Sequence, residues 1–237
     1  MTAIDGQLDD FVRAAQTALG DDLLSMVLFG SAAEDRLRPT SDVNVLLLLK
    51  RFDQARIDQL REPLRLAHAA IRLSPMFVLR EELEPATRAF AVKFREIQRR
   101  HVLLHGSDPF ATLEVSRTAS VLRLRQELLN LTLRLRQAYM LRSLREEQLV
   151  FAIANAAGPL RAAAATLIDL NGESPLAPKE ALEKLAREIR PADDELLASM
   201  SQAREKRQLP PGSAGTILLG LAELAGELHR RAEALAT

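Results

Sequence analysis

The stretch Leu28-Phe29-Gly30-Ser31, followed after ten residues by Asp42-Val43-Asn44 and the apolar run Val45-Leu46-Leu47-Leu48-Leu49, decides the fold. The segments Leu23–Phe29 and Val43–Leu49 have the length and the apolar content of short strands that are buried on both faces. A Gly-Ser pair ends the first of these strands and an Asp-x-Asn triplet begins the second. The sequence therefore predicts two neighbouring strands with polar side chains at one end.

Four residues at this end of the predicted strands are candidates for ligand binding. Because side chains of a strand point alternately to its two faces, Asp42 and Asn44 are expected on the same face. Gly30 allows a ligand to come close to the backbone. Ser31 is expected to begin a helix, and the free N–H groups of a helix N-terminus suit a phosphate. The pattern predicts a phosphate-binding turn beside a polar pair.

Composition excludes several classes of protein. The 237 residues include no cysteine, which excludes disulfides, thiolate catalysis and zinc–cysteine sites. The four histidines are scattered and do not suggest a zinc site. No apolar run approaches the roughly 20 residues that a membrane span needs, and the acidic N-terminus lacks a signal-peptide layout, so we expect a bacterial-type cytoplasmic protein without a membrane partner. A net charge of zero and 4% aromatic residues argue against nucleic acid as a partner.

The periodicity of apolar residues changes near residue 112. The first part reads as alternating helices and strands, with helices at Ile4–Leu19 and Asp53–His68 and further strands at Met76–Leu79, Phe90–Phe94 and His101–Leu104. The second part reads as amphipathic helices at about 115–142, 145–170, 177–189, 193–206 and 213–235. The fold class predicted is α+β, with a mixed-sheet domain at 1–112 and an all-helical domain at 113–237.

The Gly-Ser turn and the Asp-x-Asn triplet resemble the nucleotidyltransferase superfamily of the DNA polymerase β type, whose pattern is Gly-Ser followed by Asp-x-Asp on the next strand. Ser41-Asp42 matches the Ser-Asp pair at the start of that strand. The run Phe90–Ile97 with Val102–Gly106 resembles the strand pair that closes the domain in stand-alone bacterial members, and Pro159–Gly172 is similar to part of their C-terminal helical domain. The likeness spans nearly the whole chain.

The resemblance implies a mechanism and a set of site residues. It implies transfer of a nucleotidyl group from ATP or another NTP, with two Mg²⁺ ions held by the paired aspartates and a third carboxylate from a later strand. Carried over residue by residue, it assigns Gly30, Ser31 and Ser41 to nucleotide binding. Arg36, in the polar stretch between the two strands, is either a solvated loop charge or a further nucleotide-binding residue that grips a triphosphate. The resemblance leaves Asp42 as the metal ligand of this chain.

The chain departs from this pattern at two positions. Asn44 replaces the second aspartate, and Lys93 falls where related proteins have an acidic residue on the third strand. Mg²⁺ prefers anionic oxygen ligands, so Asp42, Asn44 and Lys93 together make a poor metal site. Lys93 could instead neutralise Asp42, because opposite charges about 4 Å apart gain about 4 kcal/mol at an effective dielectric near 20. The sequence therefore predicts a degenerate site.

Three functions are compatible with these residues. The first is a weakly active or inactive nucleotidyltransferase that binds a nucleotide or another phosphate. The second is an active Mg-dependent enzyme that modifies a small molecule or a protein, with the third carboxylate among Glu81, Glu82 and Glu96. The third is a non-catalytic interaction module, acting as a homodimer or as one half of a toxin–antitoxin-like pair.

A row of arginines accompanies the first helix of the helical part. Arg123, Arg134 and Arg145 recur every 11 residues, so they flank the apolar stripe of this helix in a line. They are either a solvated edge whose aliphatic stems cover the core, or a site for an anionic ligand, such as nucleotide phosphate or RNA, between the two domains.

Overall fold

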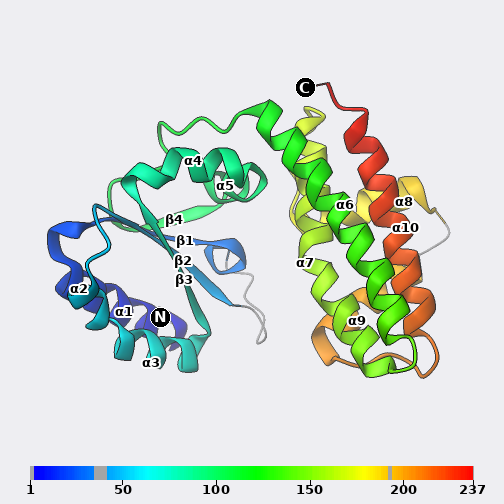
Figure 1. The fold of residues 1–237 in the computed structure, drawn as a ribbon, viewed down its shortest axis with the longest axis horizontal. Helices are drawn as coiled ribbons and strands as arrows, with labels where there is room; N and C mark the ends of the chain where they lie inside the picture. The colour runs from blue at the N-terminus through cyan, green and yellow to red at the C-terminus, as the bar shows by residue number, and fades with distance from the viewer. Residues whose placement is uncertain (1–2, 35–41, 192–193, 237) are drawn as a thin grey trace. The chain divides into compact units, whose positions relative to one another are not determined.

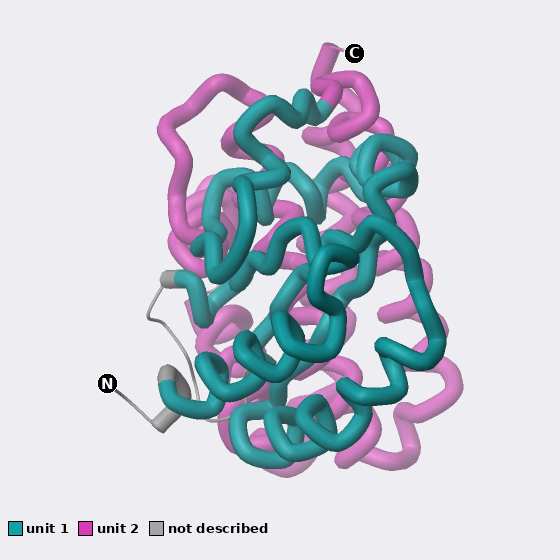
Figure 2. Tube along the Cα trace, turned by 90° about the vertical axis from the view of Figure 1, so that its left-hand side faces the viewer, with its two compact units in different colours: residues 1–115 teal, residues 116–237 magenta. Residues whose placement is uncertain are grey.

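A computed structural model describes residues 3–34, 42–191 and 194–236 of the chain (Figure 1). It divides into two compact units, residues 1–115 and 116–237, which Figure 2 colours separately. The sequence places a boundary at about 112, and the structure divides the chain after Val115.

The first unit is built on a mixed four-stranded sheet with helices on both faces. Its strands are β1 (Leu23–Phe29), β2 (Val43–Leu49), β3 (Leu73–Leu79) and β4 (His101–Gly106). Its helices are α1 (Ala3–Leu19), α2 (Gln54–Asp58), α3 (Arg61–Ile71), α4 (Leu83–Ala89) and α5 (Ala91–Arg99), with short 3₁₀ turns η1 (Gly20–Asp22), η2 (Gly30–Glu34) and η3 (Arg80–Glu82). The strand order is β3-β2-β1-β4, and only the β2–β3 pair is parallel. The predicted α+β class is confirmed.

The central strand β2 is buried on both faces, as its apolar run predicts. Its odd-numbered residues Val45 and Leu47 belong to the core that α1 and α3 cover. Leu46 and Leu48 belong to a second core on the opposite face, where α5 contributes Phe94 and Ile97. Asn44 is the one residue of β2 that is not fully buried. Asn44 alternates with the same set of residues as Leu46 and Leu48, so its side chain faces the α5 side of the sheet.

Two predicted elements of the first unit differ from the structure. The strand expected at Phe90–Phe94 is wrong, because this segment is the start of helix α5. Phe90, Val92 and Phe94 alternate like strand residues, but Phe90 is 49% exposed and the residues that reach the core follow helical spacing. The helix expected at Asp53–His68 is divided into α2 and α3, with Pro63 in the first turn of α3, where no backbone donor is needed.

The second unit is a bundle of helices, and each of its predicted helical segments is a helix. The helices are α6 (Arg117–Arg142), α7 (Glu146–Leu170), α8 (Pro178–Ile189), α9 (Asp194–Lys206) and α10 (Ala214–Glu233). Helix α7 packs against α6, α8, α9 and α10. By length and composition α7 alone, among the described helices, could cross a membrane, but 67% of its most apolar window is buried in the protein. That burial is typical of the core helix of a soluble protein.

Candidate functional site

The candidate site lies where β1 ends and β2 begins. Phe29, the last residue of β1, pairs with Asn44 near the start of β2. Gly30 follows with φ of 78°, a left-handed conformation that side chains disfavour. A Cβ atom at Gly30 would lie 3.5 Å from Nδ2 of Asn44, and the same Nδ2 donates a hydrogen bond to the backbone oxygen of Asp42 at 3.3 Å. The structure thus brings Gly30, Asp42 and Asn44 together.

The segment after Gly30 differs from the predicted helix. Ser31 lies in η2, a five-residue 3₁₀ turn, and not at the start of an α-helix. Such a turn has too few aligned peptide dipoles to act as the N-terminus of a long helix would. Arg36 and Ser41, the other two residues assigned to nucleotide binding, lie outside the described residues.

The sequence did not point to Arg72, which is the cation paired with Asp42. Oδ1 of Asp42 accepts a hydrogen bond from Nε of Arg72 at 2.9 Å and forms an ion pair with Nη2 of the same side chain, also at 2.9 Å. Arg72 ends helix α3 in a left-handed conformation with φ of 54°, and its carbonyl accepts from the N–H of Val43 at 3.2 Å. The pairing of β2 with β3 explains this contact. Leu73 pairs with Val43 in parallel register, so Arg72, the residue before Leu73, lies beside Asp42, the residue before Val43.

The Asp42–Arg72 pair remains accessible to solvent. The two side chains are 51% and 56% exposed. An exposed ion pair contributes about 1 kcal/mol or less, because water screens the attraction and two side chains lose freedom. Arg72 can therefore leave Asp42 at little cost when a ligand binds, and it can itself hold an oxyanion through its planar guanidinium group.

The neighbouring strand contributes a serine to this site. Ser74 of β3 pairs with Asn44 in parallel register. By the alternation of the strand it shares the face of Met76 and Val78, which pack in the core on the α5 side. The strand position next to Asn44 therefore carries a neutral hydroxyl group, and the residues Asp42, Asn44 and Ser74 provide a single carboxylate.

Lys93 occupies a different place from the one the sequence predicts. It lies on helix α5 and not on a strand. Its Nζ is 5.6 Å from the centroid of the Phe29 ring, a distance at which a cation is attracted to the ring face. Because Phe29 is the last residue of β1, this contact places Lys93 near the end of that strand. The cation bonded to Asp42, however, is Arg72.

The three candidate third carboxylates lie elsewhere or have other partners. Glu81 and Glu82 are in η3, which follows the opposite end of β3 from Ser74. Glu82 accepts a hydrogen bond from the N–H of Leu79 at 2.9 Å. Glu96 on α5 pairs with Arg100 at 3.2 Å. Within residues 3–34, 42–191 and 194–236, no group of three His, Cys, Asp or Glu side chains could hold a metal ion.

Comparison with known proteins identifies the fold. No protein-family model matches the chain. The structure is similar to the crystal structure of spectinomycin adenyltransferase AAD(9) from Enterococcus faecialis with ATP and spectinomycin, with a TM-score of 0.63, 11% identity, and coverage of 97% of this chain and 99% of that one. The chain has the nucleotidyltransferase fold.

A sequence relative gives a second, shorter match. A segment of 52 residues is 40% identical to the "Putative protein adenylyltransferase MJ1305" of Methanocaldococcus jannaschii. The match covers 22% of this chain and 35% of the archaeal protein, so the chain spans about a third of that relative. The resemblance to nucleotidyltransferases that the Gly-Ser turn indicated is confirmed at the level of the fold.

Helix α5, which covers the face of the sheet toward which Leu46 and Leu48 point, carries more positively than negatively charged side chains. Helix α5 carries Lys93, Arg95 and Arg99 against one acid, Glu96. Burial lowers the pKa of Arg95, and burial together with the nearby Arg95 and Arg100 lowers that of Arg99. Guanidinium groups nevertheless stay charged at neutral pH.

Proposed function

We propose that the chain is a nucleotide- or phosphate-binding protein of the nucleotidyltransferase fold whose metal site is degenerate, so that nucleotidyl transfer is weak or absent. One observation carries this proposal: the strand positions that meet at the site end hold one carboxylate, Asp42, beside the neutral Asn44 and Ser74. Two-metal catalysis needs anionic oxygens that bridge and orient both ions. A single carboxylate already bonded to a guanidinium group does not supply them.

Binding of a phosphate is supported by the groups that surround the carboxylate. Gly30 leaves room for a ligand against the backbone beside Asn44. Arg72 presents a half-exposed guanidinium group, and Lys93 stands over the neighbouring Phe29. These two cations offset the charge of a phosphate without a metal ion, which supports binding of ATP or another NTP without a strict need for Mg²⁺.

An active Mg-dependent transferase is a second candidate, and the comparisons favour it. The two similar proteins are named for adenylyl transfer, one to spectinomycin and the other to protein. In this chain Asp42 would hold one Mg²⁺ after Arg72 moves away, with Asn44 as a neutral oxygen ligand. The acceptor would be a small molecule or a protein. This candidate predicts that ATP binding depends on the metal.

Restoring the missing acids separates the two candidates. We expect wild-type protein to bind ATP in isothermal titration calorimetry with an affinity that Mg²⁺ changes less than about threefold. The variant Asn44→Asp with Ser74→Asp should gain about tenfold or more in affinity when Mg²⁺ is added, equal to about 1.4 kcal/mol. Release of pyrophosphate from ATP, measured in parallel, should increase only in this variant.

The control places the same added charge away from the site. Gln54→Asp with Gln59→Asp changes two exposed residues of the α2 segment, which follows the other end of β2. This control should bind ATP as the wild type does, with or without Mg²⁺. Wild-type binding that requires Mg²⁺ would establish the active candidate instead, and absence of ATP binding by both wild type and restored variant would refute both.

A further inference from the structure

The arginines of helix α6 fall into two groups according to their partners. Arg117 donates to the carbonyls of Leu170 and Ala236, and Arg125 donates to those of Ala232, Glu233 and Leu235 at 2.9–3.1 Å. They neutralise the carbonyl ends of α7 and α10, where the helix dipole favours a cation. Arg123 pairs with Glu127 at 2.9 Å. These three arginines are engaged within the helical unit, so the predicted row of Arg123, Arg134 and Arg145 is interrupted at Arg123.

The other three arginines of α6, Arg134, Arg136 and Arg142, have no such role, and two of them share a cavity. Arg134 and Arg142 are exposed, and no hydrogen bond or ion pair joins either side chain to another residue in the described part of the chain. Both line one cavity between α6 and α7, with a volume of about 460 Å³. The cavities that bind small molecules in proteins have volumes of about 300–1,000 Å³. The free guanidinium groups and the space for a ligand therefore coincide.

The wall of this α6–α7 cavity combines an apolar floor with a polar rim. The floor is formed by Leu131, Leu135 and Ala138 of α6 with Ala152 and Ala156 of α7. Gln137 and Asn155 join the two arginines as the polar residues of the lining, and no acidic residue lines the cavity. Its charge is thus positive, so a cationic ligand would be repelled and an anionic one attracted.

A proline creates a further hydrogen-bonding group at the same place. Pro159 lies inside helix α7 and lines the cavity. Because proline has no N–H group, the carbonyl of Asn155 loses the donor that an α-helix would supply four residues later. Asn155 is exposed and also lines the cavity. A ligand with a hydroxyl or amino group could donate to this carbonyl.

We propose that the α6–α7 cavity is a binding site for a small organic oxyanion. The apolar body of the ligand lies on the leucine and alanine floor, and Arg134 and Arg142 bind its carboxylate or phosphate group. The carbonyl of Asn155 accepts a hydrogen bond from a donor on the body. This site goes beyond the proposed nucleotide-binding function, because it is built entirely from the helical unit.

A pair of fluorescent probes tests the proposal on the full chain. The probes are 8-anilino-1-naphthalenesulfonate, an aromatic sulfonate, and N-phenyl-1-naphthylamine, its neutral analogue. Wild-type protein should bind the sulfonate with a stoichiometry of one. Arg134→Gln with Arg142→Gln should weaken that binding about tenfold and change the affinity for the neutral probe less than about twofold, because only the sulfonate uses the charges.

Two further variants locate the probe. Arg80→Gln with Arg136→Gln removes the same charge from exposed arginines outside the cavity and should leave both affinities unchanged. Ala152→Phe fills the cavity and should abolish binding of both probes. Unchanged sulfonate binding in either Arg134→Gln with Arg142→Gln or Ala152→Phe overturns the proposal, as does an equal loss of both probes in the double arginine variant.

Competition distinguishes an organic anion from any anion. Phenyl phosphate should displace the sulfonate probe from wild-type protein, and inorganic phosphate at the same concentration should displace at least about tenfold less, because it lacks the apolar body. Equal displacement by the two would show that the floor contributes nothing and would overturn the assignment. Thermal unfolding of each variant shows whether the bundle has kept its fold.

Discussion

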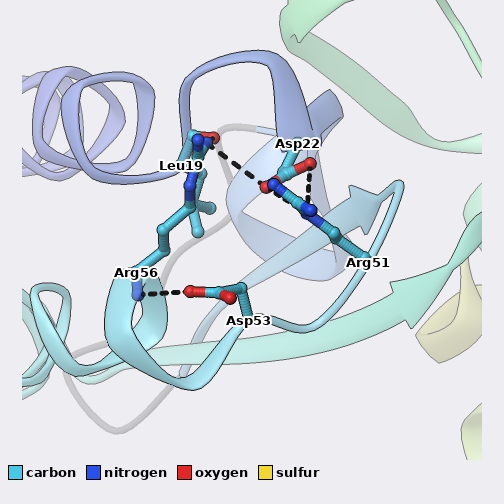
Figure 3. A network of polar contacts seen from close by, with 5 residues as sticks. All are labelled: Leu19, Asp22, Arg51, Asp53 and Arg56. Atoms are coloured by element: carbon cyan, nitrogen blue, oxygen red, sulfur yellow. Dashed lines mark hydrogen bonds and ion pairs between the residues drawn. The ribbon is translucent and has the colours of Figure 1, made fainter.

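Two aspartate–arginine pairs stand at opposite ends of strands β1 and β2, and they differ in burial. At the far end, Asp22 has a side chain only 6% exposed; both of its oxygens accept from Nε of Arg51 at 3.0 Å, and Nη1 of Arg56 is 3.2 Å away (Figure 3). At the site end, Asp42 is 51% exposed and has one arginine, Arg72. The same two residue types therefore occur in two electrostatic environments.

The network of the buried Asp22 with Arg51 and Arg56 also joins several elements. Arg56 donates through its side chain to the carbonyl of Leu19, where α1 ends, and its backbone N–H donates to Asp53 at 3.1 Å. The carbonyl of Asp22 accepts from the N–H of Lys50 at 2.8 Å. A buried charge must be compensated at this place, whereas the exposed Asp42 can exchange its partner for water or a ligand. Burial thus separates the structural carboxylate from the one available for function.

The largest effect is expected from breaking the buried network. Arg56→Gln should lower the free energy of unfolding by about 2 kcal/mol, because it leaves Asp22 with one partner in a desolvated position and removes the donor of Leu19. Urea unfolding followed by circular dichroism measures this change. The double variant Arg56→Gln with Asp22→Asn should lose less free energy of unfolding than the two single variants together, since the two residues share one interaction.

Arg65→Gln is the matched control for this prediction. Arg65 pairs with Glu62 on α3, and both side chains are more than half exposed. The hydrogen bond and charge of Arg65 lower the pKa of Glu62, yet solvent screens the pair, so the substitution should hardly change stability. A loss at Arg65 as large as that at Arg56 would show that burial does not distinguish such pairs.

A smaller effect is expected at the exposed pair. Arg72→Gly should leave the protein as stable as the wild type or more stable by up to about 1 kcal/mol, because glycine adopts φ of 54° without steric cost and the exposed ion pair contributes little. Arg72→Ala should be about 1 kcal/mol less stable than Arg72→Gly, since it keeps the strained backbone. Urea unfolding of the two variants checks both values.

The opposite result would change the interpretation of the site. If Arg72→Gly lowered stability by more than about 2 kcal/mol, the Asp42–Arg72 pair would be structural like that of Asp22. The comparison of glycine with alanine is the control here, because both remove the guanidinium group and only one retains the backbone strain.

The difference between the two pairs also explains what the sequence could predict. The strands at β1 and β2 and the turn at Gly30 follow from local pattern, and so does the closeness of Asp42 and Asn44 in the chain. Arg72 and Ser74 required the register of β3, whose start the apolar pattern places at Met76 rather than Leu73. Residues brought together by pairing leave no such local signal.

The remaining errors have physical causes of the same kind. The segment at Phe90–Phe94 alternates like a strand, and only its packing against the sheet shows that it is a helix. Asp22 is an unremarkable surface-type residue in the sequence, and its burial depends on partners 29 and 34 positions away in the chain. The roles of Asp42, Asn44 and Lys93 in binding stay predictions for the variants at the site.

The smallest effect is expected at Glu146, a partly exposed acid that shows whether backbone donors can make such a side chain structural. It accepts hydrogen bonds from the N–H groups of Gly212 at 2.9 Å and Ala214 at 3.2 Å, at the start of α10. These bonds lower the pKa of Glu146 below the value near 4.5 of a free glutamate. The pKa of Glu146 is lower in the folded than in the unfolded protein. The resulting stabilisation is therefore fully present above the unfolded pKa and is lost as the pH falls through the folded pKa.

Glu146→Gln should therefore be less stable than the wild type near pH 6, and the gap should narrow as the pH falls through the lowered pKa of Glu146, because the wild-type carboxylate then becomes neutral as well. Urea midpoints at pH 6 and at a series of lower pH values measure the gap, and Glu147→Gln serves as the control for the change in net charge. A gap that does not depend on pH would mean that the carbonyl oxygen of glutamine or glutamate, and not the charge, holds the two N–H groups. Closure of the gap would show that a partly exposed acid becomes structural when backbone donors fix it, which is the property that Asp42 lacks.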